Sequence, residues 1–291
     1  MNETMVRESI AKMVPGNISI EINPVEKNGL TLTGICARKD GSNAGPVVYW
    51  ENYFGTDDEK CRKIAEMLLH AIEQAPPIGD IMDLINDRER FLANLYPLLL
   101  EKKAAGKSLL LVKDVNDALG LYLDLDVSRP EASASVKVTH SLLEAANIEK
   151  EEAARAAFKN VAPEIQSMNG VMMLFSGKEE EMVNFFTAPD RYNPDEDGPL
   201  LYVRNGKREY RGAAAILAPQ VTDKIRQIFG GDFYILPSSI HEVIVVPADL
   251  SDASDLKQMV HDINRAEVAP HERLSDHVFL CGKDGVITVA A

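Results

Sequence analysis

The sequence predicts an α+β protein in which antiparallel sheets carry helices packed on them, divided into two sub-domains. Alternating apolar and polar residues mark many short strands, and tight turns join most neighbouring strands of the first half, which favours hairpins over parallel βαβ units. The length of 291 residues fits two domains, since one domain is expected for about 150 residues. We place the N-terminal part at residues 1–130 and the C-terminal part at residues 131–291.

The N-terminal part is predicted to open with a short amphipathic helix over residues 3–13, which Pro15 ends. The pair Asn28-Gly29 is typical of a hairpin turn and separates two alternating segments. The further predicted elements are strands over 17–23, 30–37 and 46–50, helices over 57–74 and 79–93, and strands over 95–100, 108–113 and 118–126.

The C-terminal part mixes helices and strands. Residues 139–160 are alanine-rich and helical in pattern, and Asn147 predicts a bend between two helices. Residues 187–199 combine turn formers with acids and predict an exposed loop. The further predicted elements are strands over 134–138 and 200–204, a helix over 212–229, strands over 233–236 and 240–246, a helix over 254–265, and a hairpin of 276–281 with 286–289.

The charge balance argues against polyanionic partners. The chain has 45 acidic and 31 basic residues, a formal net charge of −14. Nucleic-acid binding requires clustered Lys and Arg, so we expect no nucleic-acid partner and no anionic membrane surface. The longest apolar runs, such as 109–112 and 243–246, are far shorter than the ~20 residues of a membrane helix. The remaining partners to expect are a small molecule or another protein.

Cysteine usage indicates a reducing compartment. Cys36, Cys61 and Cys281 are scattered and odd in number, which does not fit a disulfide framework. No apolar stretch of seven or more residues follows the charged start of the chain, so no secretory signal is expected. We therefore expect a cytoplasmic protein.

The densest cluster of reactive side-chain types is the segment Pro237-Ser238-Ser239-Ile240-His241-Glu242. On a strand, Ser239 and His241 would share a face, which suggests a hydrolase with Ser239 or Ser238 as nucleophile and His241 as base. Asp276 or Glu272 would then orient the imidazole. The structural alternative is a polar turn whose hydroxyls bind backbone groups, and we favour it because a GxSxG turn is missing.

Histidine placement suggests a second enzymatic alternative. Four of the six histidines lie in the last 51 residues, and three precede an acid. A metal-dependent enzyme would need at least three of these side chains to converge. The HExxH spacing is absent, and neighbouring His and Glu on a strand face opposite sides, so we assign no metal ligand. The histidines concerned are His241, His261, His271 and His277.

Other patterns are weaker. Asp124 and Asp126 share one face of a predicted strand, as carboxylates for acid–base chemistry or Mg²⁺ do, but a solvated outer face is the commoner reason. The segment 104–108 ends like a P-loop, yet Glu101 replaces the required glycine and a strand follows. No dinucleotide motif is present, and the sequence implies no cofactor.

Several segments resemble a family of uncharacterised bacterial proteins, a domain of unknown function found largely in anaerobic gut bacteria. The resemblance to that family rests on three features: a Pro-Ser-Ser-Ile-His-Glu type motif, a preceding Asn-x-x-x-x-Gly-Ala segment and a later Leu-Ser-Asp. The chain departs from it by inserting Lys207-Arg208-Glu209 and by having Arg88 in place of a plainer Asn-rich stretch. A fainter similarity, limited to the last third, is to another uncharacterised bacterial family with a Pro-His-x-Asp strand. The matching residues are 234–244, Asn205 with 210–213, the Asn264 region, 274–276, Asn86, Leu95 and Pro97.

The resemblance implies an architecture and a motif, and neither family implies an activity. Our leading hypothesis is therefore a cytoplasmic, non-enzymatic binding or regulatory protein. Its predicted binding residues are Ser238, Ser239, His241, Glu242 and Arg273, with Ser239, His241 and Asp276 as the residues of the hydrolase alternative.

Overall fold

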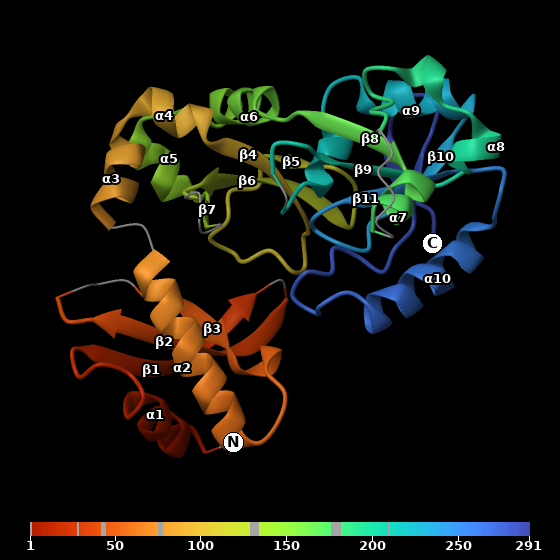
Figure 1. Cartoon of the computed structure of the whole chain (residues 1–291). Helices are drawn as coiled ribbons and strands as arrows, with labels where there is room; N and C mark the ends of the chain where they lie inside the picture. The colour runs from red at the N-terminus through yellow and green to blue at the C-terminus, as the bar shows by residue number, and fades with distance from the viewer. Residues whose placement is uncertain are drawn as a thin grey trace.

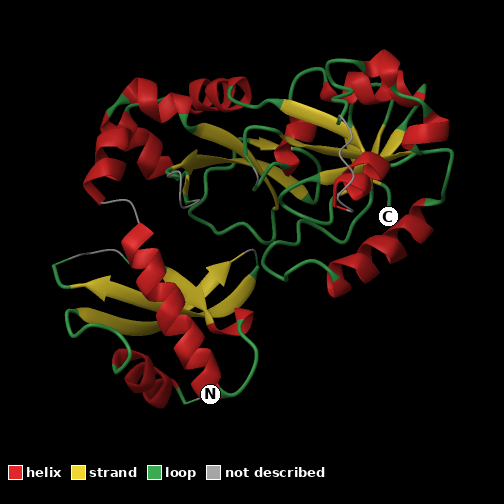
Figure 2. Ribbon diagram, in the orientation of Figure 1, coloured by secondary structure: helices red, strands yellow, loops and turns green. Residues whose placement is uncertain are grey.

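The computed structural model describes residues 2–27, 29–41, 45–74, 78–128, 134–175, 182–208 and 210–291. Within these residues the strands form three antiparallel sheets with helices packed on them (Figures 1 and 2). The predicted α+β class is therefore confirmed. In the same part of the chain, no helix combines the length and the apolar character needed to cross a membrane.

The N-terminal unit, defined here as residues 2–74, is a three-stranded sheet covered by two helices. The predicted hairpin forms, although Asn28 of its turn lies outside the described residues. Val6 and Ile10 on the first helix and Ile64 and Leu68 on the second share one apolar core with the sheet. Its elements are α1 (Glu3–Ala11), β1 (Ile18–Lys27), β2 (Leu30–Lys39), β3 (Val47–Tyr49), the 3-10 turn Trp50–Asn52 and α2 (Asp57–Gln74).

The central sheet pairs β6 with β4 along its length, and β5 and β7 pair with separate parts of β6. Four helices pack near this sheet, and Figure 1 shows them at the far end of the molecule from α10. Asn147 ends α5 in the left-handed conformation (φ 50°), which confirms the predicted bend. The elements are α3 (Ile78–Asn86), α4 (Arg88–Ala93), β4 (Leu95–Glu101), β5 (Lys113–Asp114), β6 (Leu119–Asp126), β7 (Ser135–Lys137), α5 (His140–Ala146) and α6 (Lys150–Lys159).

The C-terminal sheet has the strand order β13-β12-β10-β11-β9-β8 and is covered on both faces. Successive residues of its strands face opposite sides, so Phe233 and Ile235 join the main core while Tyr234 and Leu236 face α10. The elements are β8 (Pro163–Ser167), α7 (Met168–Phe175), the 3-10 turn Pro189–Arg191, α8 (Pro194–Asp197), β9 (Leu201–Asn205), the 3-10 helix η3 (Ala213–Leu217), α9 (Val221–Phe229), β10 (Phe233–Leu236), β11 (Val243–Pro247), α10 (Ala253–Ala266), β12 (Phe279–Cys281) and β13 (Ile287–Val289).

The largest apolar cluster joins the central and C-terminal sheets. It includes Leu98 and Leu100 of β4 together with Val203 of β9 and Phe233 of β10. The boundary predicted at residues 130 and 131 falls between β6 and β7, which pair with each other.

Several predicted elements differ in extent. The helix predicted over 79–93 divides because the Asp87 side chain accepts the N–H of Arg90 and starts a new helix there. The helix predicted over 212–229 divides at Gln220, which has φ 69°. Of the strand predicted over 108–113, only residue 113 is paired in β5. The strand predicted from residue 240 begins at 243, and β8 and α7 were not predicted.

Candidate functional site

The segment 237–242 links β10 to β11 and is held by backbone hydrogen bonds from neighbouring loops. The Ile240 N–H donates to the Glu272 carbonyl at 2.9 Å, and the Leu274 N–H donates to the Ser238 carbonyl at 3.1 Å. Ser239 forms an isolated bridge with Arg273 between these bonds. The predicted site residues Ser238, Ser239 and Arg273 are therefore brought together by the backbone.

Ser239 is buried, and its hydroxyl serves the local backbone. Its Oγ accepts the His241 backbone N–H at 2.9 Å and also contacts the Glu242 carboxyl group. This is the arrangement of a polar turn, in which a hydroxyl satisfies a backbone donor two residues on. The Arg273 Nε donates to the Val268 carbonyl at 3.1 Å, which directs this guanidinium toward its own loop.

The two ring nitrogens of His241 face groups other than Ser239. Nδ1 accepts the backbone N–H of Arg211 at 3.0 Å, and Nε2 lies 3.6 Å from Glu272 Oε1. Because Nδ1 acts as the acceptor, the proton of a neutral ring is on Nε2. A general base for serine would need a ring nitrogen within hydrogen-bond reach of the hydroxyl. Within the part of the chain that the structure describes, neither ring nitrogen of His241 is hydrogen-bonded to the Ser239 hydroxyl.

Asp276, His261 and His277 make their contacts with groups other than His241. Asp276 is exposed; its Oδ1 accepts the Asn264 side-chain N–H at 2.6 Å, and its Oδ2 is 3.6 Å from His261 Nδ1. His277 Nδ1 lies 3.2 Å from the Ala291 carbonyl oxygen. Across the described ranges, no three His, Cys, Asp or Glu side chains are grouped so as to hold a metal ion.

A buried ion-pair network lies beside His241. Asp124 is fully buried, with Oδ2 3.1 Å from Arg208 Nη2 and Oδ1 2.8 Å from Arg211 Nη1. Arg208 is itself buried between the rings of Tyr96 and Tyr210, its guanidinium carbon 4.6 and 4.5 Å from their centroids. The prediction that Asp124 lies on a solvated face is therefore wrong, because both faces of β6 are covered. Asp124 instead joins β6 to the loop that follows β9.

Arg211 carries backbone strain at this position. Its φ of 56° lies in the left-handed region, which side chains other than glycine rarely occupy and which costs about 1–3 kcal/mol. Three bonds hold it there: its N–H to His241, and its guanidinium to Asp124 and to the Ser135 hydroxyl. Strain held in this way is common where a side chain must keep one orientation for binding.

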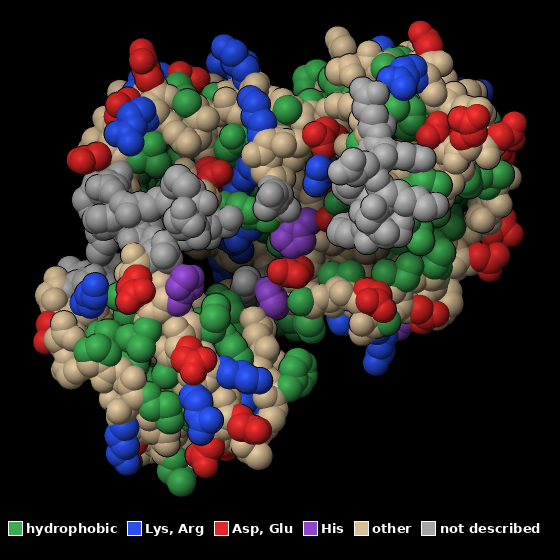
Figure 3. Space-filling view, in the orientation of Figure 1, with side chains coloured by type: hydrophobic (Ala, Val, Ile, Leu, Met, Phe, Trp, Pro, Cys, Tyr) green, Lys and Arg blue, Asp and Glu red, His purple; other side chains and the backbone are tan. Residues whose placement is uncertain are grey.

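Side chains from three parts of the chain meet around Arg211. Tyr49 of the N-terminal unit has its ring 6.2 Å from the His271 ring, and the charge of Arg211 acts on the pKa of Tyr49, which burial raises. His271 Nε2 lies 3.7 Å from the Glu272 oxygen that also faces His241. Figure 3 shows histidine and basic side chains around the hollow between the N-terminal unit and the rest of the molecule. We name the set Tyr49, Lys137, Arg211, His241, His271 and Glu272 the Arg211 junction.

Lys137 is a partly buried cation of the Arg211 junction. Burial is the largest influence on its pKa and lowers it, and the nearby charge of Arg211 lowers it further. Asp124 opposes this shift, but two guanidinium groups already share that carboxylate. A bound anion would stabilise the charged form of Lys137.

Glu242→Gln is expected to raise the free energy of unfolding at pH 7. Burial raises the pKa of Glu242 above its ordinary 4.5, and His241, Ser239 and Arg204 oppose this shift while Glu272 adds to it. The folded protein therefore keeps this proton to higher pH than the unfolded chain. The stability that this protonation gives is fully present below pH 4.5 and is lost as the pH rises through the folded-state value.

Glutamine resembles the protonated acid, so the gain over wild type should be largest near neutral pH and should vanish below pH 4.5. Urea denaturation of both proteins at pH 4 and pH 7 measures this difference. The exposed Glu267→Gln variant is the control and should match wild type at both values. An equal effect of Glu242→Gln at both pH values would contradict the assigned burial of this carboxyl group.

The comparisons with known proteins agree with the sequence resemblance. A family model described as a family of unknown function (DUF5688) matches residues 3–282. The chain belongs to this family. The comparisons with curated proteins and with solved structures found no match. Membership in DUF5688 therefore accounts for nearly the whole chain and assigns it no activity.

Sequence reasoning missed the basic half of the site. Lys137 was predicted only as part of a short strand, and Arg211 was noted only within a segment of family resemblance. One signal was available: Arg211 lies directly before Gly212 and Arg208 three residues before Arg211, so both come near the start of η3. That pattern gives no indication of the partner Asp124, which is more than eighty residues away in the sequence.

Proposed function

We propose that this protein is a non-enzymatic binding or regulatory protein that binds a small molecule bearing an anionic group at the Arg211 junction. The observation that carries the proposal is the pair of cations Lys137 and Arg211, where burial and mutual repulsion lower the pKa of the lysine. An anion placed between them would accept hydrogen bonds from both cations, and such charge-assisted bonds are among the strongest in proteins.

The geometry of the predicted motif favours binding over serine chemistry. The Ser239 hydroxyl accepts a backbone N–H, and His241 Nδ1 accepts the N–H of the strained Arg211. We infer that the motif orients Arg211 and the loop at residue 272, and that Ser238, Ser239 and Glu242 act as supporting residues. Arg273 holds that same loop through Val268.

The position of the site supports a regulatory role. Tyr49 belongs to the N-terminal unit, whereas the other members of the Arg211 junction come from the rest of the chain. A ligand that contacts both would therefore affect how they pack against each other. A cytoplasmic location is part of the proposal, supported by all three cysteines being buried and free of disulfides.

Lys137→Met is expected to stabilise the fold and to weaken anion binding. The charged lysine costs stability below its lowered folded-state pKa, and methionine keeps the side-chain length without the charge. We expect the melting temperature to rise by about 1–3 °C, since each kcal/mol corresponds to a few degrees at this size. Titration with inorganic pyrophosphate at low salt should show at least about tenfold weaker binding than wild type.

Lys113→Met on the neighbouring strand β5 is the matched control, because Lys113 is exposed and lies outside the Arg211 junction. It should bind pyrophosphate as wild type does. The proposal fails if wild type shows no saturable pyrophosphate binding, or if Lys137→Met and Lys113→Met bind it equally well.

A further inference from the structure

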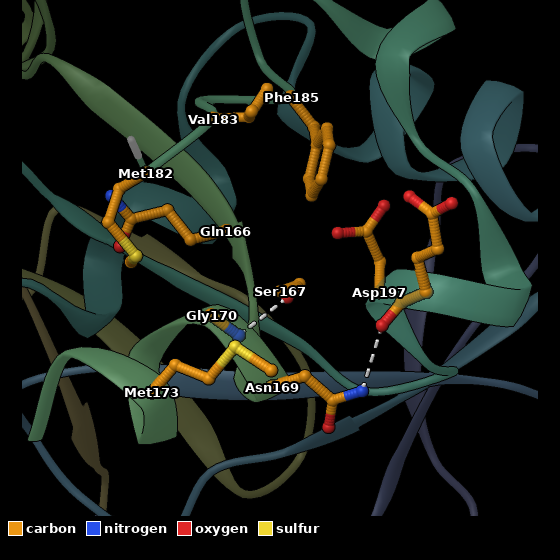
Figure 4. Close-up of a pocket in the computed structure, with 10 residues that line it drawn as sticks. Gln166, Ser167, Asn169, Gly170, Met173, Met182, Val183, Phe185 and Asp197 are labelled. Atoms are coloured by element: carbon orange, nitrogen blue, oxygen red, sulfur yellow. Dashed lines mark hydrogen bonds between the residues drawn. The ribbon is translucent and has the colours of Figure 1, made fainter. Parts of the chain in front are cut away.

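A cavity lies at the end of β8, and no residue of the Arg211 junction lines it. Its volume is about 450 Å³, within the range of about 300–1,000 Å³ that is usual for small-molecule sites. Four parts of the chain line it: the end of β8, the first turns of α7, residues 182–185 and α8 (Figure 4). Two hydrogen bonds drawn there hold its wall, from the Gly170 N–H to Ser167 Oγ at 2.8 Å and from the Asn169 side chain to the Glu196 carbonyl at 3.2 Å.

Part of the cavity lining is apolar. Met173, Met182, Val183 and Phe185 line it, and Figure 4 shows the Phe185 ring extending toward the cavity. Aromatic faces attract organic cations, and phenyl and thioether side chains both pack well against hydrocarbon groups. This wall therefore suits the apolar body of a ligand.

The rest of the lining is polar and acidic, and Figure 4 shows Gln166 and Asp197 across the cavity from each other. Figure 4 shows the Asp197 carboxylate directed into the cavity, and its Oδ2 is held by the Asn193 N–H at 2.8 Å. Gln166 is only 7% exposed and lines the cavity, yet its amide has no hydrogen bond to any residue that the structure describes. The amide is accessible from the cavity, so its oxygen and its N–H groups can bind a polar group of a ligand. The described lining contains carboxylates and no Lys, Arg or His.

We propose that this cavity binds an organic ammonium ion with an apolar body. The ammonium group lies against Asp197, the Gln166 side-chain oxygen and the Ser167 hydroxyl accept its remaining hydrogens, and the apolar part contacts Phe185 and the methionines. The site uses none of the residues of the Arg211 junction, so it stands whether or not an anion binds there.

The test compares three probes of one shape: benzylammonium, benzyl alcohol and benzoate. Calorimetric titration of the full chain at pH 7 and low salt should give saturable binding of benzylammonium, at least about tenfold tighter than benzyl alcohol, because a hydrogen bond to a charged group is worth about 1.5–3 kcal/mol. Benzoate should not bind. Failure of benzylammonium to bind, or binding as weak as that of the alcohol, would overturn the proposal.

Variants locate the site. Asp197→Asn keeps an oxygen that can accept the Asn193 N–H and should reduce benzylammonium affinity to that of the alcohol. Asp195→Asn, on the same helix but outside the lining, should change it by less than about twofold. Met173→Trp adds bulk at an exposed wall position and should abolish binding of both ligands. Equal affinities in wild type, Asp197→Asn and Met173→Trp would place the binding elsewhere and contradict the proposal.

Discussion

Asp124→Ala should lower the free energy of unfolding by about 3–4 kcal/mol, because removing one partner of a buried ion pair leaves the other charge buried without compensation. Arg208 and Arg211 both depend on this carboxylate, and Arg208 is 2% exposed. Asp126, whose Oδ2 is 3.4 Å from Arg208 Nε, compensates only part of the charge. Urea denaturation at pH 7, with circular dichroism as the signal, measures the loss.

Asp114→Ala is the matched control for this substitution. Asp114 lies on β5, directly beside β6, and pairs with Lys102 at 2.9 Å while 65% of its side chain is exposed. Such exposed pairs contribute at most about 1 kcal/mol, so the control should lose little stability. Equal losses in the two variants would show that the network around Asp124 does not join the sheets as described.

Gly212→Ala should be the most damaging small substitution in the site. A Cβ at this position would lie 2.7 Å from the His241 carbonyl oxygen and 2.8 Å from the Asn205 backbone nitrogen. Both are backbone atoms, so the chain itself must move, and forced overpacking of this kind costs about 1–3 kcal/mol or more. The shift would carry His241 away from Arg211, so we expect pyrophosphate binding to be lost along with about 3 kcal/mol of stability.

Gly231→Ala provides the comparison, since a Cβ there meets no atom within 4 Å and its φ is not positive. Its melting temperature and its pyrophosphate affinity should match those of wild type. A Gly212→Ala protein with unchanged stability would contradict the close approach of these two loops.

Local patterns predicted most of the fold. Alternation in β1, β2 and β10 and the apolar stripe of α2 were readable because each depends on residues a few positions apart. β8 and α7 escaped prediction because Pro163 and Met168 lie in short segments without clear periodicity. The strand predicted over 108–113 failed for a different reason: the Leu110 N–H donates to the distant Val138 carbonyl, a contact that no local pattern indicates.

Only the part of the candidate site whose residues are adjacent in the chain was predicted from the sequence. The polar segment around His241 was recognised because its residues are adjacent in the chain. Its partners Tyr49, Lys137 and Arg211 come from segments far apart in the sequence, and pairing across such distances follows from the tertiary fold alone. Asp197 was assigned to a solvated loop for the same reason, since the cavity beside it exists only when β8, α7 and α8 meet.

We propose that the Arg211 junction holds His241 through Nδ1 and presents Arg211 and Lys137 to an anion. Nitrogen-15 NMR of the imidazole rings tests it in a single titration with pyrophosphate, recorded at alkaline pH, where imidazole is ordinarily neutral. We expect His241 to carry its proton on Nε2 throughout, and the ring signals of His241 and His271 to shift saturably as pyrophosphate is added. A proton on Nδ1 of His241, or ring signals of both histidines that do not move at saturating pyrophosphate, would contradict the account.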